Sequence, residues 1–218
     1  MRKIVVRILV ISMTFMSTVS YAGNAVIGKV SAKSTVVLNP GPTQQRIGNE
    51  QFPYIQGHVV STIGSDSAQI MLNAGQASVT LAPESKASID DVTPLKFSLN
   101  QGAIGILAPA GMSVIIDSPK GLFNLSSDSG IDAVVVFRDG ELAVMPRTGR
   151  LSVEPSSGDS FSMVDPGSAF VSSQLNNAEV VDVLEGGSGI IIAILAAAAV
   201  IAGIIIAANG SEDTPTSP

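Results

Sequence analysis

The chain has 218 residues, with 12 basic and 18 acidic side chains, one histidine, and neither cysteine nor tryptophan. The absence of cysteine excludes disulfides, thiol chemistry and cysteine-bound metals. The acidic balance disfavours binding to nucleic acid and to anionic lipid headgroups, because both repel a negative surface. About 165 residues between two apolar ends suffice for one domain with its own core.

The first 22 residues have the layout of a secretory signal peptide. Three basic side chains come before residue 8, the apolar run Ile8–Met16 is too short to span a membrane, and Ser20 and Ala22 fit a cleavage site. We expect cleavage after Ala22, with an uncleaved N-terminal anchor as the alternative, and export of residues 23–188 in either case. The processed chain keeps nine basic and eighteen acidic side chains, a net charge of −9.

Residues 23–185 show short runs in which apolar residues alternate with polar ones. Alternation with a period of two predicts strands that turn one apolar face towards a core. We expect the buried set to include Ile70, Leu72, Leu81, Phe97, Val114 and Val136. Strands of four to seven residues at roughly ten-residue spacing are typical of a sandwich, a barrel or a β-solenoid.

Turn residues separate these runs. Asp139-Gly140, between Val134–Arg138 and Glu141–Met145, is the clearest tight hairpin. Asn39–Phe52 is the longest polar interruption and is expected to be a loop. No motif recurs at a fixed period, so the sequence does not support a regular repeat array.

The C-terminal end carries a second apolar segment. The residues Gly186-Gly187-Ser188-Gly189 are expected to form a flexible hinge. Ile190–Ala208 has no charge and no proline and, as a helix, would be roughly 28 Å long, close to the hydrocarbon thickness of a bilayer. We expect it to be a transmembrane helix that leaves residues 209–218 as a short acidic tail on the other side.

Small residues recur every four positions in this segment, at Ala199, Gly203 and Ala207. In lipid, such a stripe lets two helices approach closely. It predicts packing against a partner helix or a second copy, although alanine and glycine are also simply common in membrane helices.

An ordered set of short motifs in the middle region resembles the FecR domain family. It comprises a glycine followed five residues later by a threonine, a small-Ala-x-apolar-x-Leu strand, a glycine turn before a strand ending in proline, a Leu-x-x-Gly element and an acidic-Gly hairpin. The matching positions are Gly57, Thr62, Ala68, Leu72, Gly75, Gly102 and Gly140. The resemblance covers about Val26 to Val171.

The resemblance implies an all-β, periplasmic domain, β-solenoid-like or sandwich-like, that acts through protein contacts. The chain departs from the family where a Gly-Thr pair is usual, since Asn124–Gly130 lacks that pair, and His58 stands where an acidic residue is common. Regulators of this family also carry a cytosolic anti-sigma segment, and this chain has its signal peptide there. The sigma-factor role is therefore not implied.

Catalytic and cofactor motifs are missing from the sequence. His58 is the only histidine and cannot build a zinc site without further ligands. The pair Asp90-Asp91 is expected to be solvated in a loop, and no nucleophile motif, phosphate loop or dinucleotide motif is present. We expect no enzyme activity, no cofactor and no metal.

The sequence therefore predicts a non-enzymatic protein of the bacterial envelope. Its β-domain, residues 23–185, would lie in the periplasm and be held to the inner membrane by residues 190–208, where it would bind another envelope protein or an extracellular polymer. A signalling adaptor of a cell-surface regulatory system is the first alternative, and an envelope hydrolase is the least favoured one.

Overall fold

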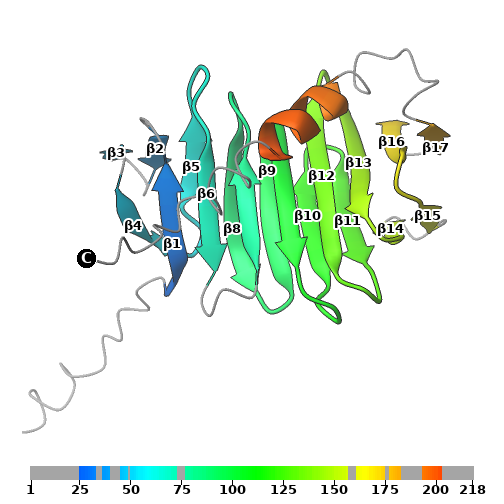
Figure 1. Ribbon diagram of the computed structural model, residues 1–218, viewed down its shortest axis with the longest axis horizontal. Helices are drawn as coiled ribbons and strands as arrows, with labels where there is room; N and C mark the ends of the chain where they lie inside the picture. The colour runs from blue at the N-terminus through cyan, green and yellow to red at the C-terminus, as the bar shows by residue number, and fades with distance from the viewer. Residues whose placement is uncertain are drawn as a thin grey trace, which may run out of the picture.

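The computed structural model describes residues 25–32, 36–39, 45–48, 50–72, 77–156, 161–174, 177–182 and 193–202. This part of the chain forms two β-sheets packed face to face and one helical segment (Figure 1). The all-β prediction is confirmed for the middle region. The expected signal peptide, hinge and acidic tail lie outside the described residues.

Sheet A is antiparallel throughout the described residues. Its strands follow the spatial order β4, β1, β6, β7, β9, β12, β13, β16 and β17. Their bounds are β1 Val26–Ala32, β4 Gln51–Ile55, β6 Ala68–Leu72, β7 Ser78–Leu81, β9 Leu95–Ala108, β12 Ile131–Arg138, β13 Glu141–Thr148, β16 Ser168–Gln174 and β17 Asn177–Asp182.

Sheet B packs against one face of sheet A and shares strand β9 with it. Its order is β3, β2, β5, β8, β9, β10, β11, β14 and β15, with β9 and β10 parallel and the other described pairs antiparallel. The remaining bounds are β2 Val36–Asn39, β3 Gln45–Ile47, β5 Val59–Thr62, β8 Lys86–Val92, β10 Val114–Ser118, β11 Gly121–Ser126, β14 Leu151–Pro155 and β15 Ser162–Val164.

Strand β9 joins the two sheets. Its first half pairs with β8 and β10 in sheet B, and its second half, from Gly102 onward, pairs with β7 and β12 in sheet A. After β9, hairpins alternate between the sheets: β10–β11 in B, β12–β13 in A, β14–β15 in B and β16–β17 in A. From β9 onward the strands therefore follow the long axis in chain order, as the colours of Figure 1 show, whereas β3 and β4 lie outside β2 and β1 at the opposite end. The molecule is a sandwich whose hairpins are stacked in the manner of a solenoid.

The core lies between the two sheets. Ile70, Leu72, Leu81, Phe97 and Val114 are buried there as expected. Val136 is buried too, but it lies on the opposite face of sheet A, outside the space between the sheets. The predicted Asp139-Gly140 hairpin is confirmed: it joins β12 to β13, with φ of +53° and +79° at its two turn residues.

Two expected loops contain strand residues in the structure. Residues 45–47 form β3, which pairs with β2 and buries Ile47, and residues 51–52 begin β4. These short edge strands are mostly polar, so their sequences show no clear alternation. Among the described residues each pairs with one neighbouring strand and has few inward positions. The pair Asp90-Asp91 lies in β8, where the register shifts between Ile89 and Asp91.

Residues 193–202 are helical. They belong to the expected transmembrane segment, whose other residues lie outside the described part of the chain. No helix among the described residues combines the length and apolarity needed to cross a bilayer.

Candidate functional site on the outer face of sheet A

Four neighbouring strands of sheet A are buried on both faces. Consecutive buried residues occur at 103–106 in β9, 133–136 in β12, 142–146 in β13 and 169–172 in β16. In β10, by contrast, buried positions alternate with more exposed ones. A strand with two apolar faces needs cover on both sides, and sheet B covers only the inner one.

The outer side of these strands carries an apolar cluster, named here the outer apolar face. Half of its members are alanine, which keeps this part of the sheet shallow. The outer apolar face consists of Ala82, Ala103, Val134, Val136, Ala143, Met145, Ala169 and Val171.

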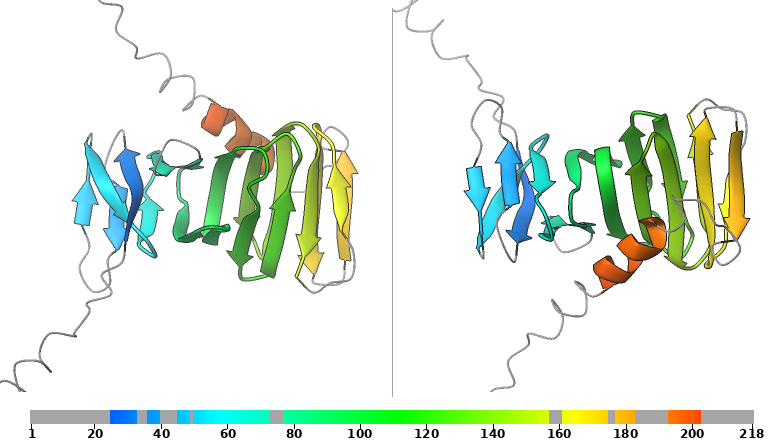
Figure 2. Two further views of the ribbon diagram at one scale, coloured as in Figure 1. Left: turned by 90° about the horizontal axis from the view of Figure 1, so that it is seen from below. Right: turned by 90° about the horizontal axis from the view of Figure 1, so that it is seen from above.

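The helical segment 193–202 lies across the outer apolar face, as both views of Figure 2 show. Ile194, Ala197 and Ile201 face the sheet, and both isoleucines are fully buried. Their spacing of three and four residues places them on one side of a helix. The buried isoleucines contribute about 1.5–3 kcal/mol each to the docked arrangement.

Gly105 forms the closest point of the contact. A Cβ atom built on Gly105 would lie 2.5 Å from Cγ2 of Ile201, and its three nearest atoms all belong to Ile201. The backbone of Gly105 is ordinary extended strand, so its missing side chain serves the helix and not a turn. Glycine weakens a strand interior and marks places where another group approaches closely.

The other side of the helix is also apolar. Leu195 and Val200 are 44% and 41% exposed, and Ala196 and Ala199 are exposed beside them. Of the expected packing stripe, Ala199 therefore points away from the sheet, while Gly203 and Ala207 lie outside the described residues.

A cavity of about 260 Å³ lies between the helix and the sheet. Ala193, Ala196 and Val200 line it from the helix, and Gln101 and Arg138 line it from the sheet. The helix therefore covers the outer apolar face without filling the whole space beside it.

Two residues of the family-like motif, Thr62 and Gly102, meet Ser85 where the two sheets join. The Thr62 hydroxyl donates to the Ala82 carbonyl at 2.7 Å and accepts from the Ser85 amide at 2.8 Å. The Ser85 hydroxyl in turn accepts from the Ala103 amide at 2.9 Å. Gly102 has φ of +88°, and a Cβ there would lie 2.4 Å from Oγ of Ser85. Thr62 and Gly102 are thus structural residues.

Gly57 lies in the turn before β5, with φ of +78°, and its amide donates to the Ile89 carbonyl at 2.8 Å. Beside it, the buried Tyr54 hydroxyl donates to the His58 carbonyl at 2.5 Å and accepts from the Ile89 amide at 2.8 Å. Burial raises the pKa of Tyr54 above its ordinary value; the hydrogen bond from Ile89 opposes the shift, and the charge of Asp90 adds to it.

The remaining motif positions are also structural where they are described. Ala68 and Leu72 are buried at the two ends of β6, and Gly140 shapes the β12–β13 turn. Gly75 lies outside the described residues.

The structure assembles no catalytic constellation among these residues. His58 contacts Tyr54 through its backbone carbonyl, and the Asp90 carboxylate accepts from the hydroxyls of Ser88 and Ser98 at 2.9 and 2.6 Å. The described residues contain no group of three or more potential metal ligands.

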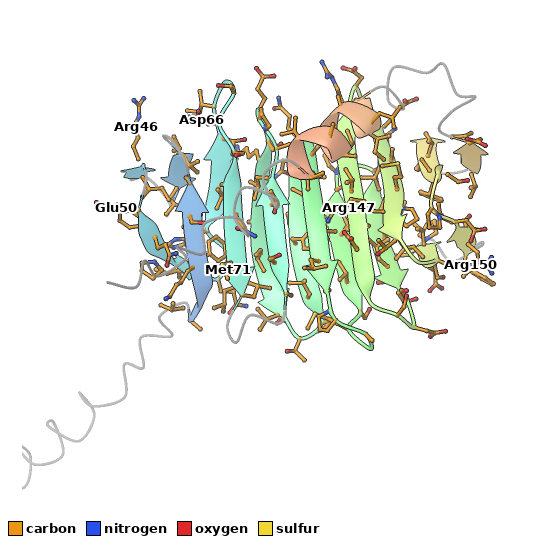
Figure 3. All side chains as sticks on the ribbon, in the orientation of Figure 1. Arg46, Glu50, Asp66, Met71, Arg147 and Arg150 are labelled. Carbon is orange, nitrogen blue, oxygen red and sulfur yellow. The ribbon has the colours of Figure 1, made fainter. Side chains whose placement is uncertain are left out.

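Ion pairs of the described chain are scattered along the molecule. Arg147 pairs with Asp132, Nε to Oδ1 at 2.6 Å, and Arg150 pairs with the exposed Asp165 at 2.7 Å. In Figure 3, Arg147 lies within the broad part of the sheet and Arg150 near the β15 end, while Arg46 marks the opposite end.

Sequence reasoning missed the outer apolar face and Ser85. The run Val134-Val135-Val136 was available as a sequence feature, since consecutive apolar residues indicate a strand buried on both faces. Nothing local indicated Ser85, which acts through residues 18 and 23 positions away.

Comparison with known proteins places the chain near few others. No protein-family model matches it, and no curated protein sequence matches it significantly. Two crystal structures of a candidate anti-sigma factor from Parabacteroides distasonis ATCC 8503 are similar in structure, at 17% and 16% identity with TM-scores of 0.45 and 0.44. Each match covers 56% of this chain and 57% of the solved one. Similarity at this level transfers no function.

Proposed function

We propose that this protein is a non-enzymatic component of the bacterial envelope: an exported β-domain, similar to FecR domains, held to the inner membrane by residues 190–208. Its domain would act by binding another envelope protein or an extracellular polymer. No cofactor, metal or nucleic acid takes part in this proposal.

The observation that carries the proposal is the apolar character of the helical segment on every side. A surface helix of a globular domain normally turns charged or polar residues outward. Here the outward residues are Leu195, Ala196, Ala199 and Val200. A helix that is apolar all round is typical of a membrane segment or of a helix with cover on both sides.

The non-enzymatic part of the proposal is supported by how several described polar groups are used. Thr62 and Ser85 satisfy backbone groups inside the sandwich, and the Asp90 carboxylate accepts hydrogen bonds from two serines. Each of these groups is engaged in holding the fold, which leaves none of them poised for acid–base or nucleophilic work.

A signalling adaptor of a cell-surface regulatory system is the second candidate. Its support is the ordered motif set, in which Gly57 shapes the turn before β5 and Thr62 and Gly102 shape the junction of the sheets. An envelope hydrolase ranks below both, and a broad hydrolase screen of the purified chain would reveal it.

Topology is the first test of the proposal. The parent chain has no cysteine, so single cysteines can be placed at Ser156, which is exposed in the structure, and at Ser217. A membrane-impermeant thiol reagent added to intact spheroplasts should label Ser156→Cys and spare Ser217→Cys. Labelling of both variants would show that residues 190–208 do not cross the membrane.

The partner is the second test. Cross-linking in intact cells followed by mass spectrometry should recover a reproducible envelope protein with the wild-type chain. Recovery of a membrane regulator would favour the adaptor, whereas recovery of a structural envelope component or of polymer-derived glycans would favour the leading proposal.

A further inference from the structure

The position of the helical segment in the structure and its proposed position in the membrane exclude each other. In the structure Ile194, Ala197 and Ile201 lie against the outer apolar face of sheet A. In a bilayer-spanning helix over residues 190–208, these same side chains would lie within the hydrocarbon core. One copy of the segment cannot do both, so the sheet and the bilayer are alternative environments for it.

The shape of the outer apolar face matches the helix. Ala82, Ala103 and Ala143 keep the surface shallow, and Gly105 leaves the space that Ile201 fills. A Cβ atom at Gly105 would collide with Ile201. A strand face exposed to water would be expected to carry polar side chains in place of this glycine and of the valines beside it.

The outward side of the docked helix indicates which environment competes with the sheet. Leu195 and Val200 are more than two-fifths exposed, with the exposed alanines Ala196 and Ala199 beside them. Residues 190–208 contain no charged side chain. Such a segment is suited to apolar surroundings on all sides. A lipid bilayer surrounds it completely, whereas the sheet covers one side of it.

We propose that the outer apolar face of sheet A and a lipid bilayer compete for the helical segment 193–202, with the docked helix as the stored form and the inserted helix, expected over residues 190–208, as the anchored form. The inference rests on the membrane anchoring proposed above. Departure of the helix would uncover the valines of the outer apolar face, and the free energy of that exposure opposes insertion. The sheet therefore sets how readily the anchor enters a membrane.

The main test is vesicle flotation with the full chain, produced in an exporting bacterial host and purified. The vesicles consist of phosphatidylcholine, which is zwitterionic and does not repel the acidic chain. Gly105→Val removes the seat for Ile201 while leaving a residue that strands favour. We expect this variant to increase the vesicle partition coefficient about tenfold or more, because the added side chain would collide with Ile201 and weaken docking.

The matched control is Leu107→Val, on the same face of the same strand but 50% exposed. It should bind vesicles as the wild type does. Ile201→Phe provides a second route, because it enlarges the side chain that fills the Gly105 space and keeps the helix apolar; it should also raise vesicle binding. Far-UV spectra of all variants verify that the sheets are retained.

A separate measurement follows the helix itself. Gln101→Cys and Ala196→Cys line the same cavity from the sheet and from the helix. In the otherwise cysteine-free chain, a short bifunctional thiol reagent should join them in solution. Phosphatidylcholine vesicles should suppress the cross-link in this double-cysteine chain. Adding Gly105→Val to it should suppress the cross-link without vesicles.

Two results would overturn the proposal in distinguishable ways. Equal and substantial vesicle binding by wild type, Gly105→Val and Ile201→Phe would refute the competition while leaving membrane anchoring intact. Absence of vesicle binding by every variant, with the cross-link unchanged by lipid, would refute both the competition and the membrane anchoring on which it rests.

Discussion

At the scale of single residues, the buried polar side chains of this protein tie strands together. Tyr54 links the turn at His58 to the amide of Ile89, and Thr62 links β5 to the segment around Ser85. Leaving a buried hydroxyl or its buried partner without a hydrogen bond lowers the free energy of unfolding by about 1–3 kcal/mol. These contacts therefore fix the register between neighbouring elements.

Tyr54 should resist ionisation in the folded chain. It is the only tyrosine beyond residue 22, so in a chain prepared from residue 23 onward tyrosinate absorbance near 295 nm reports on it alone. Because burial raises its pKa, the folded chain keeps the proton at a pH where the unfolded chain, with a pKa of about 10, has lost it. The contribution of Tyr54 to the free energy of unfolding should thus be constant below about pH 10 and be lost as the pH rises above it. Ionisation of the folded chain near pH 10 would contradict this.

Thr62→Val should destabilise the domain by about 1–3 kcal/mol, because the Ser85 amide and the Ala82 carbonyl would lose their buried partner. The measurement is denaturant unfolding, compared with Thr62→Ser, which keeps the hydroxyl and should be clearly less damaging. Equal losses in both variants would assign the effect to the Thr62 methyl group instead.

At the scale of elements, β9 holds the two sheets together as one unit. Its change from sheet B to sheet A occurs at Gly102, with a positive φ and Ser85 packed against the position of a missing Cβ. The hairpin of β12 and β13 also needs a positive φ, at Gly140, but has open space beside it. Substituting Gly140 would therefore test backbone strain alone, whereas substituting Gly102 would test backbone strain together with a steric collision.

Gly140→Ala should cost about 1 kcal/mol, the usual cost of placing a side chain in the left-handed region. Gly102→Ala should cost more, by about 2 kcal/mol or further, because the same backbone strain is joined by a collision with Ser85. Chemical denaturation of the two variants checks the order. Similar losses would mean that the β8–β9 junction relaxes around the added methyl group.

At the scale of the whole molecule, the helical segment completes the surface of sheet A. Without it, Val134, Val136, Met145 and Val171 would face water. Contiguous apolar surface of this kind binds hydrophobic dyes and promotes association.

A chain truncated after Glu185 should therefore bind a hydrophobic dye and self-associate more than the full chain. Combined Val134→Thr and Val136→Thr changes in the truncated chain should reduce both effects, since threonine keeps the strand preference and adds a polar group. Dye fluorescence and light scattering provide the measurements. Val135→Thr is the control: it faces the core and should destabilise the domain without reducing dye binding.

Much of the sandwich could be predicted from local sequence. Alternation in Ala68–Leu72 and Leu95–Leu99 marked strands and their inward residues, and Asp139-Gly140 marked a hairpin whose two positive φ angles suit those residue types. These features depend on near neighbours along the chain, through the two-residue period of a strand and the conformational range of glycine. Edge strands such as β3 escaped because a single sheet neighbour leaves too few apolar positions to form a pattern.

Tertiary structure alone decided which face of β12 meets the core. In a run such as Ala133–Val136, every residue is apolar, so alternation cannot say that Val135 points inward and Val134 and Val136 outward. It also decided that Ser85 meets Thr62 and that Gly105 receives Ile201, contacts between residues 23 and 96 positions apart. The sequence by itself determined that residues 190–208 need apolar surroundings; the sheet opposite them decided that one such environment is the protein's own surface, because hydrophobic burial has no direction and accepts any apolar surface that fits.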